Sequence, residues 1–221
     1  MLKGILFDLD GTLFDRDAAV RELVADQHRR FSGAFPRIRA ETYVARVLEL
    51  DAHGHGDKTV VYQMVTGEFG LPAPLAAELT ADFWGHYHSF CRPFAEAIPV
   101  LTELRHRGLK LGVVSNGAVS IQERVIARLG FDALVDVVLI SEREGVRKPE
   151  REIFDRALRK LDLRADETWF VGDHPEVDVE GASAAGLTAV WKRTAYWSTP
   201  DARHEQIESL EELLTSVREH L

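Results

Sequence analysis

Residues 2–14, LKGILFDLDGTLF, carry the most informative pattern in this chain of 221 residues. The apolar run at residues 5–7 predicts a short buried strand, and two carboxylates, Asp8 and Asp10, follow it directly. A carboxylate at the end of a core strand costs free energy unless a partner compensates for its charge. The stretch therefore predicts a central strand with a functional site at its carboxyl end.

The spacing of the two aspartates predicts different roles for them. In an extended backbone, Asp8 and Asp10 point to opposite faces of the strand. Gly11 lets the chain curl after the strand and swing the second carboxylate back over the first. This arrangement favours one nucleophile and one acid or base over two equivalent ligands. A strand that merely ends in an Asp-Gly turn has the same local sequence, so the rest of the chain must decide.

Composition restricts the class of protein. With 45% hydrophobic and 29% charged residues, the chain resembles an ordinary globular protein of one large domain or a core with an insertion. The net charge of −9 argues against a nucleic-acid partner. No apolar run approaches the length of a membrane span, and Asp8 and Asp10 do not suit an export signal. The single cysteine, Cys91, excludes an intrachain disulfide, so we expect a cytoplasmic protein.

Residues 15–92 have helical periodicity and little that resembles a strand. Apolar residues recur at spacings of three and four in four segments: Val20, Leu23, Val24 and Phe31; Tyr43, Val44, Val47 and Leu48; Val60, Val61, Met64 and Val65; and Leu75, Leu79, Phe83, Tyr87 and Phe90. Four successive amphipathic helices predict a small helical bundle.

From residue 93 onward, helices and strands alternate. We predict helices over residues 95–107, 120–129, 150–161, 179–185 and 207–220, and strands over residues 109–114, 135–140, 168–171 and 188–191. Helices of this length between strands imply parallel pairing through right-handed crossovers. The predicted fold class is therefore α/β, with an open parallel sheet whose ligands bind at the carboxyl ends of the strands.

Polar residues suited to phosphate follow two of these strands. Ser115 and Asn116 end the strand at residues 109–114, and a hydroxyl beside the backbone amides of a helix start suits phosphate oxygens. Lys148 precedes Pro149, which keeps the lysine backbone out of the helical region and fixes its direction. We expect Lys148 to offset negative charge on the nucleophile and the phosphate.

Two further aspartates complete the set of strand-end residues. Asp173 follows a predicted strand, and Asp178 lies five residues later, close enough to reach the same place. The aspartates at 8, 10, 173 and 178 carry −4 against +1 from Lys148, which leaves −3. A phosphate dianion would be repelled by this charge without a divalent cation. The sequence therefore predicts a metal, most simply Mg²⁺.

Taken in order, these four motifs resemble those of the haloacid dehalogenase superfamily, whose members are mostly phosphatases. The resemblance covers nearly the whole chain, and the helical insertion resembles the C1 cap of phosphoglycolate phosphatases, N-acylneuraminate phosphatases and β-phosphoglucomutases. It implies a Rossmann-like catalytic core of residues 1–14 and 93–221 with a helical cap of residues 15–92. It also implies a monomer or homodimer.

The resemblance implies a role for each matched residue. Asp8 is expected to be the nucleophile and Asp10 the general acid/base. Mg²⁺ is expected to be held by Asp8, the Asp10 carbonyl and Asp173, with Asp178 in contact with the metal or close to it. The residues expected to bind the phosphoryl group are Thr12, Ser115, Asn116 and Lys148.

We therefore expect Mg²⁺-dependent hydrolysis of a phosphate monoester of a small metabolite through an aspartyl-phosphate at Asp8. A phosphomutase shares every core residue and is the main alternative. A 2-haloacid dehalogenase does not need the second aspartate, so Asp10 together with Asp173 argues against it. Asp10 also disfavours a phosphonatase. A non-catalytic binding module fits poorly because no motif position is missing.

Specificity is expected to come mostly from the cap, since the core contacts only the phosphate. The loop at residues 51–58 is the candidate for reaching the substrate, with Arg46 as a possible anion contact. Near the end of the chain, Trp191, Tyr196 and Trp197 are expected to pack against other residues rather than to stack on substrate.

Overall fold

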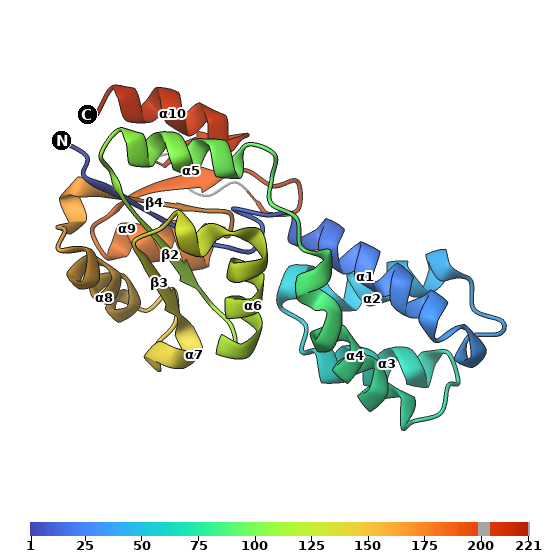
Figure 1. The fold of residues 1–221 in the computed structure, drawn as a ribbon. Coiled ribbons are helices and arrows are strands. Elements are labelled where there is room, and N and C mark those ends of the chain that lie inside the picture. The colour runs from blue at the N-terminus through green and yellow to red at the C-terminus, as the bar shows by residue number, and fades with distance from the viewer. Residues whose placement is uncertain (199–203, 221) are drawn as a thin grey trace. The chain divides into compact units, whose positions relative to one another are not determined.

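The computed structural model describes residues 1–198 and 204–220, which form two compact units (Figure 1). One unit comprises Met1–Asp15 together with Pro93–Leu221, and the other comprises Arg16–Arg92. The helical segment is thus inserted between the first strand and the remainder of the α/β unit.

The α/β unit is built on a six-stranded sheet in which every pair is parallel, in the order β3-β2-β1-β4-β5-β6. Its strands are β1 (Gly4–Phe7), β2 (Lys110–Ser115), β3 (Val137–Ile140), β4 (Thr168–Gly172), β5 (Thr188–Lys192) and β6 (Glu205–Ile207). Phe7 of β1 is paired with Val113 of β2 on one side and with Val171 of β4 on the other. The residues that follow β1, β2 and β4 therefore emerge side by side, and the predicted open parallel sheet is confirmed.

Helices cover both faces of this sheet, with α5 and α10 on one side and α8 and α9 on the other (Figure 1). The helices of this unit are α5 (Ala97–His106), α6 (Val119–Leu129), α7 (Ser141–Glu144), α8 (Arg151–Leu161), α9 (Gly181–Ala184) and α10 (Leu210–Arg218). Because helices cover both faces of the sheet, all four residues of β1 are buried. Burial on both faces explains why this strand lacks polar side chains. Leu6 is fully buried in a cluster with Phe154 and Phe170, whose rings pack edge to face at 5.2 Å.

The second unit is the predicted bundle of four helices. They are α1 (Arg16–Arg30), α2 (Ala40–Asp51), α3 (Lys58–Glu68) and α4 (Leu75–Phe90). Fully or almost fully buried aromatic residues, among them Tyr43, Tyr62 and Phe83, fill its interior. Among the described residues, none of the helices combines the length and the apolar character that crossing a bilayer requires.

The loop predicted to reach the substrate is anchored at both ends. Asp51 is 1% exposed and Lys58 4% exposed, and they form an ion pair. Arg16 adds two hydrogen bonds to the Asp51 carboxylate, of 2.7 and 3.1 Å. Arg46 forms ion pairs with Glu49 and Glu68, so its charge is already balanced within the bundle. Loss of one partner of the buried Asp51–Lys58 pair would leave an uncompensated buried charge.

The predicted helix over residues 207–220 is wrong at its beginning. Ile207 ends strand β6, in which it pairs with Lys192 of β5, and helix α10 starts only at Leu210. A strand of three residues is too short to show an alternating pattern, so the pairing with β5 decides its conformation. The segment predicted as a helix from residue 179 also begins earlier, with a π-helical turn at Pro175–Glu180.

We predict that Leu6→Ala lowers the free energy of unfolding by about 2–5 kcal/mol, because it leaves a cavity under the central strand. Urea titration followed by circular dichroism measures the change. Ile98→Ala on α5, at a side chain that is 40% exposed, is the control and should change the free energy by less than about 0.5 kcal/mol. Equal losses in the two variants would contradict the assignment of Leu6 to the core.

Candidate active site

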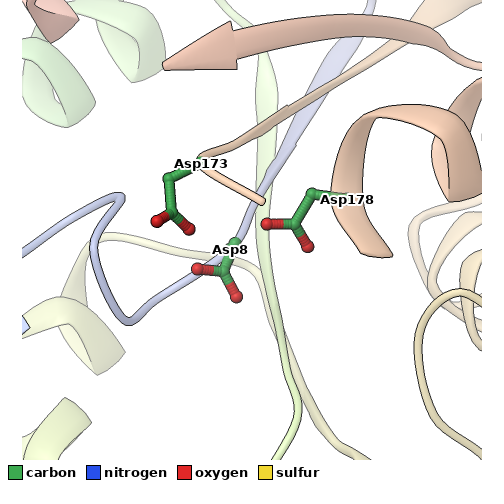
Figure 2. A group of neighbouring side chains, drawn as sticks. All are labelled: Asp8, Asp173 and Asp178. Carbon is green, nitrogen blue, oxygen red and sulfur yellow. The ribbon is translucent and has the colours of Figure 1, made fainter. Parts of the chain in front are cut away.

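Three aspartates meet at the carboxyl edge of the sheet (Figure 2). Asp8 follows β1, Asp173 follows β4, and Asp178 comes from the π-helical turn Pro175–Glu180. All three are buried, and one oxygen from each lies within 4.8 Å of the others. Figure 2 shows the carboxylates of Asp173 and Asp178 directed toward Asp8 from two sides.

Lys148 lies between two of these carboxylates. Its Nζ is 2.5 Å from Asp8 Oδ1 and 2.8 Å from Asp178 Oδ1, and the side chain is 2% exposed. The Asn116 side chain fixes the lysine backbone, because its Nδ2 donates to the Lys148 carbonyl (2.9 Å) and its Oδ1 accepts from the Lys148 amide (3.0 Å). The end of β2 thereby positions a lysine that follows β3 in the chain.

The buried carboxylates are poorly compensated by this one lysine. Burial raises the pKa of Asp8 to about 6, although Lys148 opposes the shift. Burial and the charges of Asp8 and Asp178 raise the pKa of Asp173 well above its ordinary value. Burial alone would lower the pKa of Lys148, but the two aspartates beside it outweigh that effect and raise it. The site therefore favours a further positive charge.

This donor set fits a hard divalent cation. Carboxylate oxygens are the ligands that such ions prefer, and three of them already converge on one place. Asp173 and Asp178 are also held in place, since the Asp173 carbonyl accepts from Trp191 Nε1 and Asp178 Oδ2 accepts from the His174 amide at 3.1 Å. The three carboxylates therefore form a candidate metal site without any change of fold.

A tight turn follows Asp8. Gly11 has φ +85°, and its amide donates to the Phe14 carbonyl at 3.0 Å. A Cβ at this position would lie 2.6 Å from Asp173 Oδ2, so glycine is required both for the conformation and for the close approach. The chain thus curls at Gly11 as predicted, and it keeps Asp10 at the edge of the sheet.

Two hydroxyls predicted to bind phosphate lie at the same edge. Ser115 ends β2 and is 1% exposed, and its Oγ accepts a hydrogen bond of 2.8 Å from Gln122 Nε2. Thr12 is fully buried, and its Oγ1 has no hydrogen-bond partner among the described residues. A buried hydroxyl without a partner costs free energy, which a ligand oxygen would recover.

Gln122 is a site residue that the sequence analysis missed. It lies on α6, is 5% exposed and donates to Asp10 Oδ2 at 2.7 Å as well as to Ser115. The available signal was its place in the helical pattern, since Gln122 falls three, four and seven residues before the buried Val125, Ile126 and Leu129. An amide on the apolar face of a helix needs buried partners.

Lys192 is a second buried lysine at the carboxyl edge of the sheet. Its Nζ lies 3.3 Å from the Gly11 carbonyl and 3.9 Å from the centre of the Phe94 ring. Burial lowers the pKa of Lys192, while the negative charge of Asp173 opposes the shift. The sequence feature that could have indicated this site is a lysine at the end of the apolar strand β5.

The aromatic residues after β5 do more than pack. Tyr196 Oη donates to Asp173 Oδ2 at 3.1 Å, and Trp197 Nε1 lies 3.3 Å from the same oxygen. Trp191 Nε1 donates to the Asp173 carbonyl at 2.6 Å. Trp191 and Trp197 belong to the packed core, and all three side chains also hold Asp173 in place.

Comparisons with known sequences identify relatives over most of the chain. A model of the haloacid dehalogenase-like hydrolase family matches residues 2–186. The glyceraldehyde 3-phosphate phosphatase of Methanopyrus kandleri is 29% identical, over 99% of this chain and 98% of its own length. The ribulose-1,5-bisphosphate 5-phosphatase of Halopiger xanaduensis is 32% identical, over 86% of this chain and 84% of its own.

Solved structures with the same architecture include a phosphatase and a dehalogenase. A phosphatase from Thermococcus onnurineus has a TM-score of 0.67 and 27% identity, covering 98% of both chains. A 2-haloacid dehalogenase from Pseudomonas syringae has a TM-score of 0.66 and 25% identity, covering 100% of both chains. The fold alone therefore does not distinguish the two reactions.

We predict that Asp173→Asn stabilises the metal-free protein at pH 7.5, because the charged form of Asp173 is disfavoured by burial and by its acidic neighbours. The melting temperature in EDTA, measured by scanning calorimetry, should be higher for the variant than for the wild type.

The pH dependence has a defined sign. A carboxyl whose pKa is raised by folding favours the folded state at low pH, and this contribution is lost as pH rises. For Asp8 the loss runs from pH 3.8 to about 6. A protonated Asp173 brings no such cost, so the advantage of Asp173→Asn should vanish as pH falls to the ordinary aspartate pKa of 3.8. A wild type that is more stable than the variant in EDTA at pH 7.5 would contradict the conclusion that the charged form of Asp173 destabilises the metal-free fold.

Proposed function

The chain belongs to the haloacid dehalogenase-like hydrolases, and on this premise we propose that it is a Mg²⁺-dependent phosphatase of small phosphorylated metabolites. The observation that supports it most directly is the ion pair of the buried Lys148 with Asp8, with Asp173 and Asp178 converging on Asp8. A lysine and a cation beside a nucleophilic carboxylate are what attack on a phosphate dianion requires.

In the proposed reaction, an oxygen of Asp8 forms a bond to phosphorus as the bond from phosphorus to the alcohol oxygen breaks. Asp10 gives its proton to the departing oxygen and then takes a proton from the water that attacks the aspartyl-phosphate. Lys148 stabilises the equatorial oxygens. Asp8 and Asp10 are thereby regenerated, and inorganic phosphate leaves.

Mg²⁺ would be held by Asp8, the Asp10 carbonyl and Asp173, with Asp178 beside it. When bound, the cation supplies the positive charge that lets an anionic nucleophile approach an anionic phosphate. Tyr196 and Trp197 donate to the Asp173 carboxylate and would keep it oriented toward the cation.

The phosphoryl group would be bound by the hydroxyls of Thr12 and Ser115, by Asn116 and by Lys148. The unpartnered Thr12 hydroxyl supports this assignment. Relatives named for three-carbon and five-carbon phosphates make sugar phosphates the first substrates to test. We also propose that Arg16–Arg92 acts as a cap that selects the leaving group, and that the enzyme is a monomer or homodimer in the cytoplasm, without membrane or nucleic-acid partners.

Dehalogenation is disfavoured by the residues rather than by the fold. Attack on a carbon–halogen bond needs one carboxylate, because halide leaves without a proton. Asp10, which is held at the site by Gln122, would have no leaving group to protonate in that reaction. The phosphomutase alternative uses the same residues and is distinguished by its product.

We predict that the purified protein releases p-nitrophenol from p-nitrophenyl phosphate with Mg²⁺, that EDTA removes the activity, and that Asp8→Asn abolishes it. Binding of Mg²⁺ is measured separately by tryptophan fluorescence, since Trp197 contacts Asp173. Turnover by Asp8→Asn at the wild-type rate would contradict the nucleophile. A metal response without release of phosphate from any monoester would favour the mutase, which interconverts sugar phosphates instead.

We predict that Asp10→Asn lowers turnover about 10²–10⁴-fold, because proton transfer contributes a factor of this size. Loss of the base also slows hydrolysis of the intermediate. Mass spectrometry of the acid-quenched variant should therefore show a phosphoryl group on the peptide that contains Asp8. Full activity without the second aspartate would remove the argument against a dehalogenase.

A further inference from the structure

We infer that Gln122 is a positioning residue that holds the acid/base Asp10 and the phosphate-binding Ser115 in fixed relation to each other. Its Nε2 lies 2.7 Å from Asp10 Oδ2 and 2.8 Å from Ser115 Oγ. An amide nitrogen carries two hydrogens, so it serves both acceptors at once. The inference rests on the proposed function for the roles of Asp10 and Ser115.

The orientation of the amide follows from its neighbours. The carboxylate of Asp10 is an acceptor, and the reverse orientation would bring the amide oxygen against it. Gln122 is 5% exposed, so water does not compete effectively for these hydrogen bonds. A buried hydrogen bond to a charged group is stronger than one between neutral groups.

Packing fixes the position of the amide from two sides. Gln122 lies on the buried face of α6 with Val125 and Ile126. On the other side is Gly117, where a Cβ would lie 3.0 Å from both Cγ and Nε2 of Gln122. The absence of a side chain at residue 117 therefore gives the glutamine its place, and α6 holds it there.

This arrangement links two neighbouring strand ends. Asp10 follows β1 on a turn that includes Gly11, and Ser115 ends β2. An aspartate side chain has several rotamers, and the hydrogen bond from Gln122 favours the one observed for Asp10. Holding that rotamer before substrate binds removes a cost from the reaction step. Gln122 itself contacts neither the phosphorus nor the nucleophile and acts through Asp10 and Ser115.

The test uses two near-isosteric variants. Gln122→Met removes the N–H donors, and Gln122→Glu keeps the shape while placing a second carboxylate against Asp10. We expect kcat/KM for p-nitrophenyl phosphate to fall about 10- to 100-fold in each, with most of the loss in kcat. Arg128→Met, at an exposed position of α6, is the matched control and should keep wild-type kinetics.

A double-mutant cycle separates positioning from a structural role. Adding Gln122→Met to Asp10→Asn should lower kcat less than about 3-fold further, because the Asp10 carboxylate that Gln122 positions is already gone. The same fold-loss in both backgrounds, or wild-type kcat in Gln122→Met, would overturn the inference. If Gln122→Met does not fold, Gln122→Glu takes its place in the cycle, since the Asp10→Asn background removes the carboxylate that it would face.

A crystal structure of Gln122→Met gives a result that does not depend on the activity. We expect the Asp10 side chain to leave its position or to occupy more than one. Unchanged, singly occupied Asp10 and Ser115 would overturn the inference even in an active enzyme. Absence of any phosphatase activity in the wild type would instead count against the proposed function, while the change at Asp10 would still be observed.

Discussion

The contact of Lys148 with Asp8 and Asp178 is the interaction on which the site depends. Three buried carboxylates still outnumber the buried Lys148 and Lys192, and desolvation makes such a cluster costly for folding. Replacement of these charged side chains by well-packed apolar ones would be expected to raise the free energy of unfolding. We attribute the cluster to chemistry on an anionic substrate, for which the proposed cation would complete the balance of charge.

The order of the strands makes this cluster possible. Because β1 lies between β2 and β4, the carboxyl ends of these three buried strands lie side by side. A polar residue at or after the end of each strand therefore lies at the same edge of the sheet. The crossover helices cover the faces of the sheet and leave this edge to the loops. The rigid sheet fixes where each loop starts, so short side chains such as Asp8 and Ser115 are held without long flexible segments.

Three further side chains hold the groups of the candidate site in position. Asn116 holds the backbone of Lys148, Gln122 holds Asp10, and Tyr196 holds Asp173. The same fold carries phosphatases and dehalogenases, so the reaction must be decided by such local contacts rather than by the architecture. The hydrogen bond from Gln122 to Asp10 is the strongest local argument for a reaction that moves a proton.

The sequence by itself determined the parallel α/β sheet, the inserted helical bundle and the positions of Asp8 and Asp173 directly after strands. It did so because periodicity and strand-end polar residues are local properties of the chain. Strand β6 is too short to have such a signal, and only its pairing with β5 decides it. Gln122 and Lys192 were missed, and the contact of Tyr196 with Asp173 was not predicted, for a related reason. Their partners lie 112, 181 and 23 residues away in the chain, and only tertiary structure brings such groups within hydrogen-bond distance.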